Sequence, residues 1–187
     1  AMLYDSLHRT PTRQEVRMVS LHRLTKRFGD AIAVDALTFD IPAGQIVGFL
    51  GPNGAGKSTT LKMLTGMLQP TSGSATICGF NLRTQPIEVK RRVGFVPESA
   101  AVFESLTGLE YLEMIAALYG IQPDAARDRI RQFIAFFDLS FETLTEKLLG
   151  AYSKGMRRKV AITAALLHNP PVVFFDEPLD GLDANAA

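Results

Sequence analysis

The spacing of apolar and polar positions changes along the chain between a strand-like and a helix-like pattern. Strict alternation in the second half of residues 31–41 predicts a half-buried strand. Other runs, such as QIVGFL (45–50) and VVFF (172–175), are almost wholly apolar, as expected of strands buried on both faces of a parallel sheet. The predicted strands are 16–21, 31–41, 45–50, 74–78, 93–97 and 172–175.

Helical spacing alternates with these strands. Helices are predicted at 57–68, 86–93 and 157–168, and a longer helical region extends from 106 to 150. In that region the apolar stripes are Leu109, Leu112, Ile115, Ala116 and Tyr119, then Ile130, Phe133, Ile134 and Phe137. Stripes of this kind are typical of core-forming helices. The order of elements therefore predicts an α/β sheet core with a helical insertion before the last strand.

Composition and charge narrow the class of protein. Hydrophobic residues make up 47% of the 187 residues and charged residues 21%, which is typical of a globular domain. Twenty Lys and Arg against nineteen Asp and Glu leave a net charge of +1, so no nucleic-acid partner is expected. The basic clusters 90–92 and 157–159 are interpreted as solvated helix faces. The single cysteine, Cys78, excludes an internal disulfide.

The sequence carries no signal for crossing a membrane. Its longest unbroken apolar run, AITAALL, is far shorter than the roughly 20 residues that span a bilayer. The polar start lacks the apolar centre of a secretory signal. We expect residues 1–15 to be a loose arm and residues 16–187 to form one domain.

Residues 51–58, GPNGAGKS, match the pattern GxxxxGK[ST] between an apolar strand and a helix. Its three glycines (Gly51, Gly54 and Gly56) permit a loop whose N–H groups face a phosphate chain. The following helix adds the partial positive charge of its N-terminus. Lys57 supplies a cation for the phosphates, and the Ser58 hydroxyl is a hard ligand suited to Mg²⁺. This stretch predicts a phosphate-binding loop.

Two carboxylates follow the apolar strand VVFF. Asp176 and Glu177 would lie at the carboxyl edge of the sheet, where ligand sites of α/β proteins form. Asp176 is suited to hold Mg²⁺, and Glu177 to orient and deprotonate an attacking water. An Asp-Glu pair alone usually marks a solvated strand end. Beside GPNGAGKS it indicates phosphoryl chemistry.

The stretch YSKGM (152–156) precedes the predicted helix at 157–168. Ser153 has the side chain of a helix N-cap, and Gly155 is acceptable in a first turn. The same helix start could also bind a phosphate through its N–H groups.

These motifs together resemble the nucleotide-binding subunits of ATP-binding-cassette (ABC) transporters. GPNGAGKST resembles that family's Walker A loop, and VVFFDEP resembles its Walker B strand with the adjoining glutamate. DGLD (180–183) resembles the D-loop, and YSKGM resembles the signature, usually LSGGQ. The resemblance implies a P-loop NTPase core with a mostly parallel sheet, a small antiparallel β subdomain and a helical subdomain at about 99–155, the C-terminal strands of the core being missing.

The resemblance also implies a head-to-tail pair, in which each ATP lies between one chain's Walker A loop and the other chain's signature. ATP would contact Phe28, Gly51, Pro52, Asn53, Gly54, Ala55, Gly56, Lys57, Ser58, Thr59, Glu98, Ser153, Gly155 and Asp183. Mg²⁺ would be held by Ser58, Glu98 and Asp176. Lys57 and Glu177 would be catalytic.

Three features depart from the family pattern. Phe28 stands where the family usually has Tyr, and it either stacks on adenine or is a core residue beside a turn. Glu98 replaces the usual glutamine and adds negative charge near Glu177, which bound metal would offset. The chain ends four residues after Asp183, before the family's switch histidine. We therefore expect these 187 residues alone to bind nucleotide weakly and hydrolyse it poorly.

The leading hypothesis is an ATPase subunit that drives transport through separate membrane-spanning permease subunits, at the inner face of the cell membrane in the cytoplasm. VPE together with YSKGM resembles the exporter branch of the family. The apolar stretch SAAVFESLT (99–107) would either contact those permeases or pack beneath the helices. The alternatives are a soluble ATPase of the same family acting on ribosomes or nucleic acid, and a P-loop protein without catalysis.

Overall fold

The computed structural model describes residues 17–99 and 101–177. The chain divides into two compact units, with the boundary between Arg92 and Val93. The predicted loose arm at 1–15 and Asp183 lie outside the described residues.

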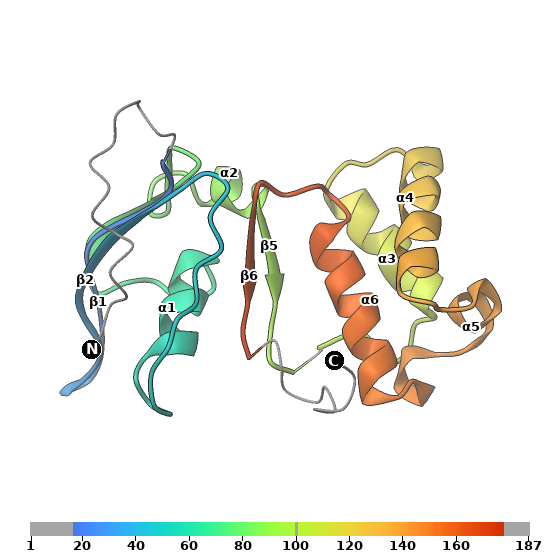
Figure 1. Ribbon diagram of the computed structural model, residues 1–187, viewed down its shortest axis with the longest axis horizontal. Coiled ribbons are helices and arrows are strands. Elements are labelled where there is room, and N and C mark those ends of the chain that lie inside the picture. Colours follow the sequence, from blue (N-terminus) through green and yellow to red (C-terminus); the bar gives the residue numbers. More distant parts are fainter. Residues whose placement is uncertain (1–16, 100, 178–187) are drawn as a thin grey trace. The chain divides into compact units, whose positions relative to one another are not determined.

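The first unit contains a four-stranded antiparallel sheet with the strand order β2-β1-β3-β4 (Figure 1). The strands are β1 (Arg17–Phe28), β2 (Ala31–Pro42), β3 (Ser72–Ile77) and β4 (Phe80–Asn81). A two-residue turn joins β1 to β2, pairs Phe28 with Ala31, and places Gly29 at a φ of 57°, which glycine adopts without strain. Alternate residues of β1, including Val19 and Leu21, are buried. This sheet confirms the antiparallel β subdomain.

Two helices accompany this sheet. Helix α1 (Lys57–Leu64) has Gly56 as its N-cap and buries Leu61, Met63 and Leu64. Helix α2 (Pro86–Lys90) is a short turn with proline at its first position, where the missing N–H costs nothing. Both helices occur where the sequence predicts them, and both end earlier than predicted.

The predicted strand at 45–50 is not formed. These residues have no regular secondary structure, and the side chains of Ile46 and Leu50 are 102% and 97% exposed. Phe49 alone packs, at 5.6 Å between its ring and that of Phe39. A strand is stabilised by hydrogen bonds to a neighbour, and no strand of the described ranges pairs with this segment.

The second unit is built on two parallel strands, β5 (Val93–Val96) and β6 (Val172–Phe175), paired in register from Val93–Val172 to Val96–Phe175. Helix α6 (Lys154–Leu166) packs against β5 (Figure 1). A Cβ atom at position 94 would collide with the carbonyl oxygen of Ala165. Gly94 therefore allows α6 to lie directly on the strand.

The helical insertion forms the rest of this unit. It contains α3 (Gly108–Leu118), α4 (Pro123–Phe136), α5 (Phe141–Glu146) and the short η1 (Leu149–Ala151). Helix α3 packs against α4, α5 and α6. Part of the predicted stripes supplies the core of the insertion: Leu112, Ala116, Ile130 and Ile134 are buried, and Leu109 and Ile115 are partly buried against them. Tyr119 is 38% exposed, and Phe133 and Phe137 are only half-buried. The helical periodicity therefore identified part of this core.

The start of α3 has a reciprocal cap. The Thr107 side chain accepts a hydrogen bond from the Glu110 N–H, and the Glu110 carboxylate accepts one from the Thr107 N–H at 2.8 Å. These bonds hold the pKa of Glu110 below its usual value.

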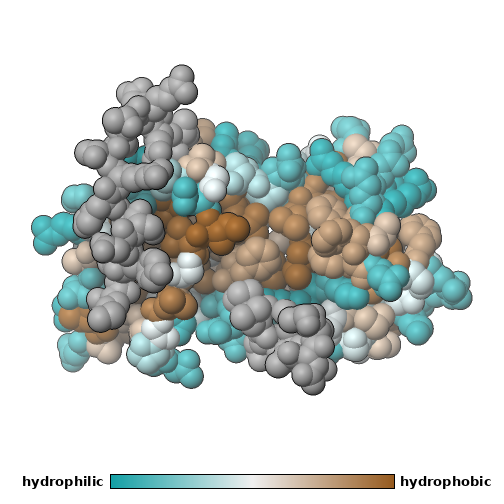
Figure 2. Space-filling view, in the orientation of Figure 1, coloured by the Kyte–Doolittle hydropathy of each residue, from teal (hydrophilic) through white to brown (hydrophobic). Residues whose placement is uncertain are grey.

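Hydrophobic surface is visible on both units (Figure 2). The large exposed apolar side chains include Ile46, Leu50, Phe103, Leu118 and Phe136. Within the described parts of the chain, no helix has the length and hydrophobicity needed to cross a membrane.

His168 follows α6 and packs face to face on Tyr119 at the end of α3, with ring centroids 3.7 Å apart and an interplanar angle of 9°. Both its ring nitrogens are buried without a hydrogen-bond partner among the described residues. Burial lowers the pKa of His168, and a weaker interaction with the Val93 backbone offsets this in part. The folded chain therefore favours the neutral ring.

This burial predicts a loss of stability in mild acid. Below about pH 6.5 the His168 ring is protonated in the unfolded chain, whereas in the folded chain it stays neutral until the pH reaches its lower folded pKa. Across this range the free energy of unfolding therefore falls as the pH falls. The urea midpoint should be lower at about pH 5.5 than at about pH 7.5. In His168→Phe, which keeps the ring stack and cannot titrate, the difference should shrink.

His22 is exposed on β1, and His22→Gln serves as the matched control that should retain the full pH difference. A His168→Phe variant as sensitive to mild acid as the wild type would contradict this assignment.

Candidate nucleotide-binding site

The predicted phosphate-binding loop leads directly into the N-terminus of α1. The Ala55 N–H donates to the Pro52 carbonyl at 3.1 Å, and the Thr60 N–H donates to the Gly56 carbonyl at 2.8 Å, which begins the helix. Residues 51–55 are exposed and 56–59 are half-buried. The loop backbone is therefore open to a ligand from solvent.

Gly56 is the residue that fixes the loop. Its φ is 86°, and a Cβ atom there would collide with the Ala33 carbonyl oxygen and lie 3.1 Å from the Val34 side chain. A side chain is therefore excluded, and the start of α1 rests directly on β2. As the N-cap of α1, Gly56 also provides no side-chain acceptor for the first helical N–H groups. These features fit a loop that binds an anion through its backbone.

Lys57 folds over this loop. Its ammonium group donates to the carbonyl oxygens of Gly51 at 2.7 Å and Pro52 at 3.2 Å. A phosphate chain in the loop would compete for the same ammonium group. Ser58 and Thr59 follow in the first turn of α1, at the helix end where a phosphate-bound cation would be held.

Phe28 lies at the end of β1, opposite Ala31 of β2. Gly56 contacts Ala33, two residues further along β2, so the aromatic ring and the loop belong to the same end of the hairpin. The ring is 52% exposed, and the Lys26 ammonium lies 5.0 Å from its centroid. Phe28 is therefore an accessible ring and not the core residue of the alternative interpretation.

The predicted carboxylates lie at one edge of the parallel pair in the second unit. Asp176 follows β6, is 6% exposed, and donates its N–H to the Val96 carbonyl at 2.9 Å. Glu98 follows β5, and Glu98 and Glu177 are both exposed. Within the described ranges, no group of three or more His, Cys, Asp or Glu residues is arranged to hold a metal by itself. A Mg²⁺ ion here would rely on waters and phosphate oxygens, as it commonly does.

Glu177 has a φ of 48°. Left-handed backbone is uncommon for a residue with a side chain and costs about 1–3 kcal/mol. Five other non-glycine residues of the described ranges also have positive φ, so this conformation alone assigns no role to Glu177.

Ser153 begins α6, and its hydroxyl oxygen accepts a hydrogen bond from the Met156 N–H at 3.2 Å. The helix-cap interpretation is therefore confirmed. The preceding Tyr152 is buried, and its hydroxyl donates to the Thr143 carbonyl at 2.8 Å, which anchors this helix start to the helical core. A Cβ atom at Gly155 would meet nothing nearer than the Ser153 oxygen at 4.0 Å. The fold tolerates a side chain there, so packing does not explain the glycine.

The interpretation of residues 157–159 as a solvated face is wrong for two of them. Lys159 donates to the Phe137 carbonyl at 2.7 Å. Arg158 donates to the carbonyls of Pro97 at 2.6 Å and Glu98 at 3.1 Å. A signal was present in the sequence: position 158 shares a helix face with the buried Ala161 and Ala165.

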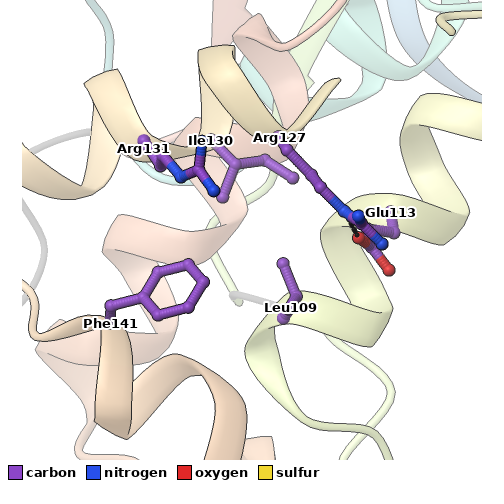
Figure 3. Close-up of a pocket in the computed structure, with 6 residues that line it drawn as sticks. All are labelled: Leu109, Glu113, Arg127, Ile130, Arg131 and Phe141. Atoms are coloured by element: carbon purple, nitrogen blue, oxygen red, sulfur yellow. Dashed lines mark hydrogen bonds and ion pairs between the residues drawn. The ribbon is translucent and has the colours of Figure 1, made fainter. Parts of the chain in front are cut away.

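A separate hollow of about 210 Å³ lies in the helical insertion (Figure 3). Leu109 and Glu113 of α3 face Arg127, Ile130 and Arg131 of α4, with Phe141 of α5 beside them. The Arg127 guanidinium pairs with the Glu113 carboxylate at 2.8 Å. None of the residues predicted to bind nucleotide lines this hollow.

A protein-family model described as ABC transporter matches residues 34–180, which is more than three quarters of the chain. The chain belongs to the ABC transporter family. A relative, the daunorubicin/doxorubicin resistance ATP-binding protein DrrA of Streptomyces peucetius, is 41% identical over 170 residues, covering 91% of this chain and 51% of that protein. The chain thus spans about half the length of this curated relative.

Solved structures agree with this assignment. An ATP-binding subunit of an ABC transporter superposes with a TM-score of 0.81 at 32% identity, covering 89% of this chain and 69% of that one. The ATP-binding cassette MJ0796, a dimer in a post-hydrolysis state bound to ADP and Pi, gives 0.79 at 27%, covering 89% and 77%. The P-loop NTPase fold class predicted from the sequence is therefore confirmed.

The contact at Gly56 predicts a sharp difference between two loop glycines. In this ABC protein, Gly56→Ala should lower the free energy of unfolding by about 2 kcal/mol or more, because it combines positive φ with a backbone clash. It should also abolish binding of a fluorescent ATP analogue. Both quantities are measured by urea titration and equilibrium binding.

Gly54→Ala is the matched control. Gly54 also has positive φ, at 83°, but a Cβ atom there has open space, so its cost should be about 1 kcal/mol. Equal losses in the two variants would show that the contact with β2 does not fix the loop.

Proposed function

We propose that the protein binds ATP through residues 51–59 and hydrolyses it to drive transport. The observation that carries this is the loop itself, which is open, lacks a side-chain cap and is held by Gly56 against β2. The relatives support this proposal, since DrrA is an ATP-binding protein and the MJ0796 structure is bound to ADP and Pi. No observation favours a ribosomal or nucleic-acid role.

We assign the following roles to the predicted site residues. Lys57 would transfer its hydrogen bonds from the loop carbonyls to the phosphates, and Phe28 would stack on adenine. Ser58 and Asp176, together with Glu98, would hold Mg²⁺, which when bound neutralises charge on the phosphate oxygens. Glu177 would orient the attacking water and accept its proton.

A second copy would complete each site. Ser153 and the Gly155 N–H lie at an exposed helix start, where packing leaves space at Gly155. We infer that this end binds the γ-phosphate held by a partner's Lys57. The dimeric state of MJ0796 supports this arrangement. Asp183, predicted to contact ATP, lies outside the described residues.

Permease subunits would receive the motion at the inner face of the cell membrane. In the stretch 99–107, Val102 and Leu106 pack against the helical core. Phe103 is 59% exposed, and its ring lies edge-on to that of Tyr111, with 6.1 Å between the ring centroids. The packing interpretation therefore holds for Val102 and Leu106, and Phe103 is left open to a partner. We propose Phe103 as the residue that contacts a permease, within a helical subdomain at about 99–155.

Head-to-tail pairing predicts complementation between two inactive variants. Lys57→Ala and Ser153→Ala should each lose most ATPase activity. Mixed together, they form some dimers with one intact site, so activity should recover to as much as about a quarter of the wild type. Phosphate release is the measurement.

The control mixes Lys57→Ala with the double variant carrying both substitutions, which cannot assemble an intact site. Recovery in that control, or none in the first mixture, would exclude a shared site.

Glu177→Gln should separate binding from chemistry. Hydrolysis should fall by about 10²–10⁴-fold because the general base is lost, while ATP binding remains and an ATP-dependent dimer accumulates in size-exclusion chromatography. The exposed Glu142→Gln, on α5, is the control and should behave as the wild type. A Glu177→Gln protein that still hydrolyses ATP normally would reassign the base.

A further inference from the structure

One guanidinium group joins the three segments on which the second half of the proposed site depends. Arg158 donates from one terminal nitrogen to the carbonyls of Pro97 and Glu98, at 2.6 and 3.1 Å. Its other terminal nitrogen donates to the Glu177 carbonyl at 3.4 Å. These acceptors lie where β5 and β6 end, and Arg158 itself lies in the second turn of α6, the helix that begins at Ser153.

We propose that Arg158 is a positioning residue for ATP hydrolysis, which sets the backbone of Glu98 and Glu177 according to the position of the Ser153 helix. This inference rests on the proposed function. It adds a physical link between the phosphate contact at the helix start and the carboxylates that act on metal and water.

The geometry supports coupling rather than simple anchoring. A helix is stiff over five residues, so a displacement of Ser153 carries Arg158 with it. The acceptors on Glu98 and Glu177 are the carbonyls of the residues that carry the exposed carboxylates. Glu177 is also held at a φ of 48°, and surrounding contacts must maintain such a conformation. A planar guanidinium can bond both strand ends at once, which an ammonium group cannot do with the same geometry.

A second arginine that bonds the other end of α6 provides a matched comparison. Arg129 of α4 donates to the Leu167 carbonyl at 2.8 Å and so holds the opposite end of α6. Both arginines are half-buried and both bond main-chain carbonyls. Arg129→Gln therefore removes an anchor of the same kind without touching Glu98, Glu177 or Ser153.

The test measures kcat, KM and ATP affinity in the full-length subunit with its partners, for wild type, Arg158→Gln, Arg158→Lys and Arg129→Gln. Arg158→Gln should lower kcat by about ten- to a hundredfold, because misplaced catalytic groups lose rate. Affinity for ATP should change little, since the loop at 51–59 is untouched. Arg158→Lys should give an intermediate kcat, and Arg129→Gln a normal one.

Hydrogen exchange provides a second readout if Arg158→Gln is poorly folded. Arg158→Lys should then show faster exchange of the Asp176 N–H, which bonds the Val96 carbonyl beside this group, and Arg129→Gln should not. Equal kcat in Arg158→Gln and Arg129→Gln, or a loss confined to ATP affinity, would overturn the proposal. An inactive wild type would instead refute the proposed function.

Discussion

In each unit, the predicted site residues lie beside a close contact between backbones that glycine alone permits. Gly56 lets the start of α1 rest on the Ala33 carbonyl of β2, and Gly94 lets α6 rest on β5 beneath Ala165. A methyl group at either position would collide with a carbonyl oxygen. These contacts fix how closely each helix approaches its strand, because a close-packed interior leaves no room for a shift. The loop at 51–55 and the carboxylates of Glu98 and Glu177 can then be ordered while remaining exposed.

Helix α6 makes a different interaction at its start, in its second turn, on its buried face and just beyond its end. Ser153 caps its start, Arg158 bonds the strand ends, and Ala161 and Ala165 pack on the sheet side. Beyond its last turn, His168 stacks on Tyr119. The polar groups are bonded mainly to main-chain carbonyls, whose positions depend on the fold rather than on a particular side chain. The helix therefore connects a candidate ligand contact to the core of its unit.

Much of the site was predictable because its motifs are local. The glycines and Lys57 of the loop, the carboxylates after β6 and the Ser153 cap each depend on residues a few positions apart. Periodicity also identified the helical core, since residues on one helix face are buried together. Arg158 was misread because charge runs are usually solvated, and its partners lie about 20 and 60 residues away in sequence.

By itself, the sequence indicated the family and the phosphate loop through short motifs, and the helical stripes through repeated spacing. Only the tertiary structure decided which apolar runs become strands. Residues 93–96 and 172–175 pair with each other, whereas 45–50, equally apolar, remain exposed. An apolar composition favours burial of a segment, but a strand forms only where another strand supplies its hydrogen bonds.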